Sequence, residues 1–234
     1  VATKVLYAAP AGSAFNGPFT LCPRAKHCAV GCIAETGRLA FNKPSLLWKA
    51  VLSVGAPDLF QRLLILDVAK HGAKAGKEGY IPAVRVDGTT DTGLGILLAQ
   101  AFASMPFEVE KLGITTPIKW YDYTKMRRQS VFPKQGDKAV VLPPNYSLTY
   151  SYSELDSGLS LPPVNVAVVF DTLEGRELPA WYRGRRVISG DANDNRFLDY
   201  LEASYTGELL IIGLTWKSAT RLNRAANVKA ANRA

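Results

Sequence analysis

The segment that decides the fold is Ile81-Pro82-Ala83-Val84-Arg85-Val86, which runs directly into the polar stretch Asp87-Gly88-Thr89-Thr90-Asp91. The apolar and β-branched residues predict a buried strand, and the polar residues indicate where that strand ends. Apolar residues then recur at helical spacing from Asp91 to Ser104. A strand, a polar turn and a helix in this order are typical of a crossover unit in a parallel sheet.

The same alternation of strands and helices extends along the chain of 234 residues. A helix is expected to begin at Pro57 and to stop at Gly72. We therefore expect an α/β fold, arranged as a complete or partial β/α barrel in a single domain of residues 1–216. The other predicted strands are runs rich in β-branched or aromatic residues, at 4–8, 118–123, 146–152, 164–170, 186–188 and 209–214.

The composition of the chain excludes several classes of protein. A hydrophobic content of 47% with 21% charged residues excludes wholesale disorder, coiled coils and collagen-like fibres. No apolar run approaches the ~20 residues that cross a bilayer, so no membrane partner is expected. Residues 1–10 contain one lysine and only a short apolar stretch, which is too weak a pattern for a secretory signal peptide. An intracellular location is therefore expected. With His27 and His71 as the two histidines, triads that depend on histidine are disfavoured.

Three cysteines, Cys22, Cys28 and Cys32, lie within eleven residues of a segment that reads as a loop. Thiols clustered in a loop usually bind a metal, whereas structural thiols follow the periodicity of the core. Arg24 and Lys26 would offset the negative charge of the thiolates. Three fortuitous thiols without a metal remain the alternative.

Two inorganic centres suit three thiolates: zinc with a fourth ligand, or a 4Fe-4S cluster with one open iron. His27 is adjacent to Cys28 and could hardly bind the same ion without strain, and His71 is distant in a helical pattern. We therefore expect a 4Fe-4S cluster, with zinc as the alternative.

Residues 146–153 alternate strictly between apolar and hydroxyl side chains. In a barrel the aromatic side would face the helices, and the hydroxyls would line the interior, where a ligand could bind them. An antiparallel strand with its hydroxyls in solvent is the alternative. The hydroxyl side contains Ser147, Thr149, Ser151 and Ser153, and the other side contains Tyr146, Leu148, Tyr150 and Tyr152.

Polar residues gather at the ends of five predicted strands. Each ending alone is ordinary, because Asp and Gly form turns and cap helices. Together they predict a ligand site at the mouth of the barrel, where the carboxyl ends of parallel strands converge. The five endings are 85–91, 122–125, 151–154, Asp171 and 189–191.

Several of these segments resemble, in order, the phage "gene product 88" family, over residues from about 15 to about 215. The family's cysteine loop and barrel-like pattern are in turn similar to those of radical SAM proteins. In this chain five and then three residues separate the cysteines, where the radical SAM motif has three and then two. Ile33 also follows the last cysteine where the family tends to carry an aromatic residue. The resembling segments are 22–34, 85–88, 121–125, 145–153, 165–170 and 190–199.

The resemblance implies a cluster whose open iron binds S-adenosylmethionine and generates an adenosyl radical. Arg85 would then meet the carboxylate of that cofactor, and Asp87 or Asp122 its ammonium group or ribose hydroxyls. Ser147, Thr149 and Ser151 would supply neighbouring polar groups.

The basic extension of residues 217–234 contains five cations and no acid. It predicts contact with nucleic acid, an acidic protein surface or a larger phage assembly, although a solvated tail is commoner for this composition. The alternative to an enzyme is a phage protein that a cluster or zinc stabilises and that serves assembly or binding. The expected location is the cytoplasm of the bacterial host, or association with the virion.

Overall fold

The computed structural model describes residues 1–10, 20–24, 39, 41–126, 142–153, 156, 158–170 and 177–215. The helices that these residues form are α2 (Lys43–Gly55), α3 (Pro57–Lys77), α4 (Leu94–Ser104), α5 (Pro106–Lys111) and α6 (Arg196–Thr206). The strands are β1 (Ala2–Val5), β2 (Pro82–Arg85), β3 (Lys119–Thr124), β4 (Tyr146–Ser151), β5 (Val166–Phe170), β6 (Trp181–Tyr182), β7 (Arg185–Ser189) and β8 (Ile211–Thr215).

The strands form one sheet in the order β1-β2-β3-β4-β5-β8-β7-β6. All neighbouring pairs are parallel except β6 and β7, which are antiparallel. The predicted α/β class is confirmed, and β1 to β5 are neighbours in chain order as in a β/α barrel. Among the described strands the sheet stays open, with β1 and β6 at its edges, so a closed barrel is not confirmed.

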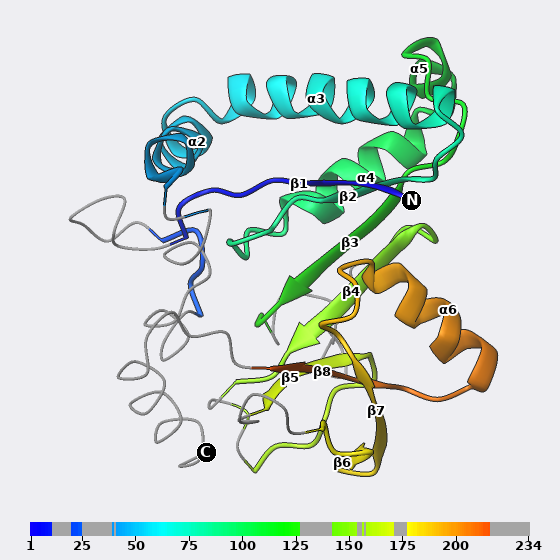
Figure 1. Ribbon diagram of the computed structural model, residues 1–234. Coiled ribbons are helices and arrows are strands. Elements are labelled where there is room, and N and C mark those ends of the chain that lie inside the picture. The colour runs from blue at the N-terminus through cyan, green and yellow to red at the C-terminus, as the bar shows by residue number, and fades with distance from the viewer. Residues whose placement is uncertain are drawn as a thin grey trace, which may run out of the picture.

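Helices cover both faces of the sheet (Figure 1). Helix α3 packs on β1 and β2 and helix α4 on β3, whereas α6 packs on the other face, against β3 and β4. Because the connection from β2 to β3 and that from β7 to β8 run in opposite directions along the sheet, right-handed crossovers place their helices on opposite faces. The face that the sequence predicted as a barrel interior therefore carries α6.

Helix α3 corrects one boundary. It begins at Pro57 as predicted, but it continues through Gly72 and ends at Lys77, so the predicted stop is wrong. Gly72 is buried, and a Cβ there would lie 3.2 Å from Ile114 and 3.3 Å from Ile118. Glycine at this position permits close packing and does not end the helix. Helices α2 and α5 and strand β6 were not predicted.

Alternate residues of the central strands build a core on each side. Trp120 of β3 meets Phe102 of α4 edge to face, with ring centroids 5.4 Å apart. On the opposite face Tyr121 packs against Phe197 of α6. Both faces of the central strands are thus buried, as a parallel sheet requires.

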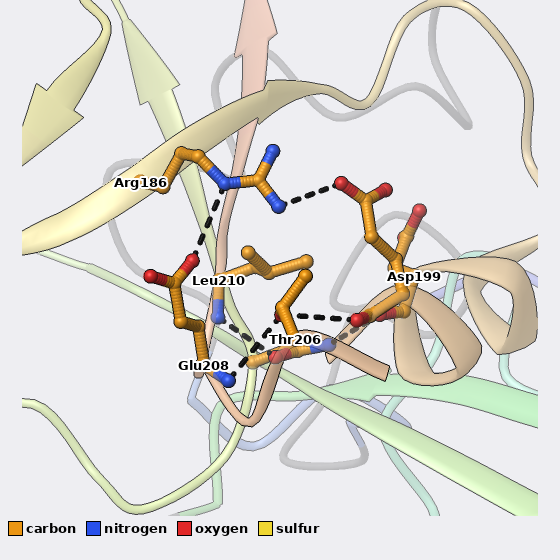
Figure 2. A network of polar contacts seen from close by, with 7 residues as sticks. Arg186, Asp199, Thr206, Glu208 and Leu210 are labelled. Atoms are coloured by element: carbon orange, nitrogen blue, oxygen red, sulfur yellow. Dashed lines mark hydrogen bonds and ion pairs between the residues drawn. The ribbon is translucent and has the colours of Figure 1, made fainter. Parts of the chain in front are cut away.

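A polar network anchors α6 to the strands on either side of it in sequence (Figure 2). Arg186 of β7 forms ion pairs with Glu202 of α6 at 2.7 Å and with Glu208 at 3.4 Å. The side chain of Asn165 accepts from the backbone N–H of Leu210 at 2.9 Å and donates to the carbonyl of Asp199 in α6 at 3.4 Å. Contacts from β7 and from the residue before β5 therefore hold α6 over the sheet.

Candidate functional site

The loop that follows β2, residues 86–93, is joined to the chain that follows β1. The N–H of Gly88 donates to the carbonyl of Leu6 at 3.0 Å. The hydroxyl of Thr89 donates to the carbonyl of Ala8 at 2.6 Å and accepts from the N–H of Ala8 at 3.2 Å. A Cβ on Gly88 would lie 2.5 Å from the Leu6 oxygen, so only glycine fits this approach.

Asp87 organises the interior of this loop. Its carboxylate is buried and accepts from the hydroxyls of Thr90 at 2.5 Å and Thr92 at 2.8 Å. Its second oxygen accepts from the N–H of Gly93 at 2.9 Å, directly before α4. Since the loop's own donors use both oxygens, Asp87 acts as a positioning group for the turn into α4.

Asp122 of β3 lies in the core between β4, α4 and the same loop. One oxygen accepts from the N–H of Asp87, and the other accepts from the hydroxyl of Tyr146, both at 2.8 Å. Helix α4 approaches so closely that a Cβ on Gly95 would lie 2.2 Å from this second oxygen. Burial, and after it the negative charge of Asp87, raises the pKa of Asp122 to about 8. The carboxyl therefore keeps its proton to a higher pH than an exposed aspartate does.

Asp91 links the cysteine segment to the ends of β3 and β4. Its N–H donates to the carbonyl of Leu21 at 2.8 Å, and its carboxylate accepts from the N–H of Lys125 at 2.8 Å. The ammonium group of Lys125 in turn donates to the hydroxyl of Ser151 at 3.1 Å. Burial raises the pKa of Asp91, and the hydrogen bond from Lys125 opposes this rise. One chain of contacts thus crosses the carboxyl edge of the sheet.

The first cysteine of the predicted metal site lies at this edge. Leu21 donates its N–H to the carbonyl of Pro10 at 2.8 Å, and the N–H of Cys22 donates to the hydroxyl of Thr20 at 3.1 Å. Cys22 is half-buried, and two residues later the Nε of Arg24 is buried with no hydrogen-bond partner in the described part of the chain.

The rest of the predicted metal site, Cys28 and Cys32, lies outside the described residues. Within the ranges that the structure describes, no three His, Cys, Asp or Glu side chains form a group that could hold a metal ion. His71 lies 3.1 Å from the carbonyl of Ala2, at the amino end of β1 and thus away from Cys22. The cluster and its zinc alternative therefore stay predictions, without a described fourth ligand.

A second polar region lies on the sheet face that α6 covers. The register places Tyr121 beside Ser147 and Tyr123 beside Thr149, and the Arg85 guanidinium lies 4.6 Å from the Tyr123 ring centre. The hydroxyls of Tyr121 and Thr149 and the Nε of Arg85 are buried with no hydrogen-bond partner among the described residues. Buried polar atoms normally have partners, so a bound molecule could satisfy this group.

A family model for Gene product 88 matches residues 2–227 of the chain. The chain belongs to the Gene product 88 family. The resemblance to this phage family is confirmed, and the match adds no support for a radical SAM relationship. No curated protein and no solved structure matches the chain. In the described part of this Gene product 88 protein, no helix is both long and apolar enough to cross a membrane.

The residues predicted to bind a cofactor do not form one group in this Gene product 88 protein. Asp122 faces α4, on the same side as Tyr146, whereas Ser147 and Thr149 lie on the side of α6. The predicted alternation of hydroxyl and apolar side chains along β4 is confirmed. The alternative, an antiparallel strand with its hydroxyls in solvent, is wrong, because β4 is parallel to both neighbours and nearly all of it is buried. Asp171 and residues 217–234 lie outside the described part of the chain.

Three residues of the site were not predicted from sequence. Tyr146 was expected to face helices, but its hydrogen bond to Asp122 was not predicted. No binding role was predicted for Tyr121, whose buried hydroxyl has no partner among the described residues. Arg196 of α6 is fully buried and lies 3.0 Å from Asp199. Burial raises the pKa of Asp199 to about 6, and the charge of Arg196 opposes the rise. The sequence could have indicated this ion pair, because Arg196 and Asp199 are three positions apart in a helix and so lie on the same side of it.

Proposed function

We propose that this phage protein is an iron–sulfur protein in which Cys22, Cys28 and Cys32 hold a 4Fe-4S cluster at the carboxyl edge of the sheet. The position of Cys22 carries the proposal. The adjacent residue, Leu21, is hydrogen-bonded to Asp91, so the cysteine segment begins beside the ends of β1 and β2. In open α/β sheets, ligands bind outside the carboxyl ends of the strands.

The described residues near Cys22 fit an anionic cluster. The buried Nε of Arg24 has no hydrogen-bond partner in the described structure, and its guanidinium would offset the charge of thiolate ligands. Three thiolates also leave one iron of the cluster with an open position. No further ligand from the chain is needed, which agrees with the location of His71 beside Ala2.

The proposal extends to an enzyme of the radical SAM type, acting on a polar substrate at a partial β/α barrel. The bound cluster would supply the electron that cleaves S-adenosylmethionine. Arg85 would bind a carboxylate, and the hydroxyls of Tyr121 and Thr149 would donate to the bound molecule. Helix α6 would keep water from this face. The consecutive parallel strands β1 to β5 support the partial barrel.

A second candidate is a phage protein without catalytic activity, in which a cluster or a zinc ion only stabilises the cysteine segment. This reading is favoured by Asp87 and Asp122, whose carboxyl oxygens already accept hydrogen bonds from the protein itself. Residues 217–234 would then bind nucleic acid or an acidic protein surface. The protein would act in the host cytoplasm or within a phage assembly.

Anaerobic isolation of the full chain, followed by metal analysis and absorption and electron paramagnetic resonance spectra, separates these candidates. About four irons per chain, with spectra that change on addition of S-adenosylmethionine, support the enzyme. The same iron content with unchanged spectra supports the structural cluster, and about one zinc per chain supports the zinc form. A chain that binds neither metal overturns both candidates.

Substitutions connect the metal to the named ligands. Cys22→Ala, Cys28→Ala and Cys32→Ala should each strongly reduce the bound iron. Ser104→Ala, at an exposed position in the last turn of α4, is the matched control and should retain it. If Cys22→Ala retains the full iron content and an unchanged spectrum, Cys22 is not a ligand and the proposed centre is wrong.

A further inference from the structure

A cavity of about 230 Å³ lies between the edge strand β1, its neighbour β2 and helices α2 and α3. Its walls include Leu64 and Val68 of α3 and Val84 of β2, which are all buried apolar side chains. At about 30 Å³ per water molecule, the space equals that of roughly eight waters. It is therefore large enough for a small organic molecule and too small for a nucleotide.

Four charged residues line the same cavity: Lys4, Lys49, Asp67 and Arg85. The guanidinium of Arg85 lies over the Tyr123 ring and donates to the carbonyl of Gly88, so the charges considered at the cavity are those of the other three. The ammonium group of Lys4 lies 2.5 Å from the carboxylate of Asp67, and both are partly exposed. Lys49 of α2 contributes the third charge and is half-buried. Burial lowers the pKa of Lys49, the charge of Asp67 opposes this shift, and the charge of Lys4 adds to it. Without Arg85, whose guanidinium is engaged elsewhere, two cations against one anion leave a net charge of +1 at an otherwise apolar cavity.

We infer that this cavity binds a small monocarboxylate with a short apolar tail. The carboxylate lies beside Lys49, whose charge is not balanced by the pair of Lys4 and Asp67. The tail contacts Leu64, Val68 and Val84, where burial of apolar surface stabilises it. A phosphate fits less well, because it carries more charge than the one unbalanced cation offsets and has no apolar part to contact Leu64, Val68 and Val84.

This inference does not rest on the proposed function. The cavity is on the α3 side of the sheet and includes none of the cysteines, and the unpartnered hydroxyls of Tyr121 and Thr149 are on the α6 side. Arg85 is shared with the proposed function, but its guanidinium lies over Tyr123 and is not used here. A monocarboxylate could therefore bind whether or not the chain holds a cluster.

The experiment is a titration of the full chain with hexanoate, hexanol and inorganic phosphate, followed through methyl resonances of Leu64, Val68 and Val84. Hexanoate should give saturable shifts of these methyl groups. Hexanol, which has the same tail without a charge, should bind at least about tenfold more weakly, and phosphate should not displace hexanoate. Absence of saturable shifts with hexanoate overturns the inference, as does equal binding of hexanol.

Substitution of Lys49 tests the charged contact. Lys49→Met keeps an apolar stem of similar length and should weaken hexanoate binding about tenfold to a hundredfold. Lys70→Met, at an exposed position of α3, is the matched control and should bind like the unaltered chain. Lys49→Gln serves the same test if Lys49→Met does not fold, and unchanged hexanoate affinity in a folded Lys49 variant overturns the inference.

Discussion

The hydroxyl of Tyr146 donates a 2.8 Å hydrogen bond to the carboxyl of Asp122, across two neighbouring parallel strands. The other oxygen of Asp122 accepts from the N–H of Asp87, in the loop after β2. One buried carboxyl group therefore joins β3 to β4 and to the start of the crossover that leads to β3. The stability of this part of the sheet should therefore depend on pH, through the protonation of Asp122, and on substitutions that remove or crowd its carboxyl group.

The pH dependence of stability should reveal the buried Asp122. Its pKa is about 8 in the folded protein, against about 3.9 for an unfolded aspartate, so the folded state binds more protons between these values. The free energy of unfolding should therefore fall as the pH rises from about 4 to about 8. Asp122→Asn should flatten this slope, because an amide carries no charge: its oxygen can accept from the Asp87 N–H, and its NH2 group can donate to the Tyr146 oxygen. Urea unfolding at several pH values measures the effect.

Asp58→Asn, at an exposed position in the first turn of α3, is the control for that experiment and should leave the slope unchanged. Asp122→Ala should instead destabilise the protein by about 2–5 kcal/mol, since it leaves the Asp87 N–H and the Tyr146 hydroxyl without their acceptor. An equal slope in Asp122→Asn and the unaltered chain would contradict the assignment of the raised pKa.

Gly95→Ala should be destabilising although it lies in a helix. An added Cβ would lie 2.2 Å from the Asp122 oxygen, inside a packed core that must shift to admit it. We expect a loss of about 1–3 kcal/mol. Gly55→Ala is the matched control at the end of α2, where a Cβ meets nothing within 4 Å, so it should be neutral or slightly stabilising. Thermal unfolding of both variants decides the point.

Asp87→Ala should loosen the loop before α4. The substitution removes the acceptor for Thr90, Thr92 and the N–H of Gly93, and we expect a loss of about 3 kcal/mol. Amide hydrogen exchange should increase in residues 88–93 and in the first turn of α4. Asp194→Ala, at an exposed position, should change neither stability nor exchange in this loop.

Thr149→Val should stabilise the protein when no ligand is bound. The Thr149 hydroxyl is buried with no hydrogen-bond partner among the described residues, so an isosteric methyl group removes a desolvation penalty of about 1 kcal/mol. Thr89→Val is the contrasting variant, because its hydroxyl forms two hydrogen bonds with Ala8 and its loss should be destabilising. Denaturant midpoints compare the two. Destabilisation by Thr149→Val would show that its hydroxyl already has a partner.

Local patterns predicted the central strands well and some helices poorly. Strand β4 was recognised because its side chains alternate, and strand β2 because an apolar and β-branched run leads into Asp87 and Gly88. Helix α2 was missed because its apolar residues do not define one face: Leu46 is buried, whereas Trp48 and Val51 are exposed. Strand β6 has two residues, which is too short for any periodic signal.

The candidate site was predicted in its parts but not in its grouping. Asp87 and Asp122 were identified as polar residues at strand ends, and they do interact. Their role differs from the expected one, because the protein's own donors use their oxygens. These hydrogen bonds come from Gly93 to Asp87 and from Tyr146 to Asp122. No local sequence pattern specifies that these donors lie beside the two carboxyl groups.

The sequence by itself determined which residues form β2, β3 and β4 and which polar residues end them, because strand formation and turns depend on neighbours along the chain. The tertiary structure alone decided which sheet face each helix covers, since this follows from the order of the strands. That order places α6 over Thr149 and α4 against Asp122, and so it determines which polar groups lack partners and which carboxyl group retains its proton.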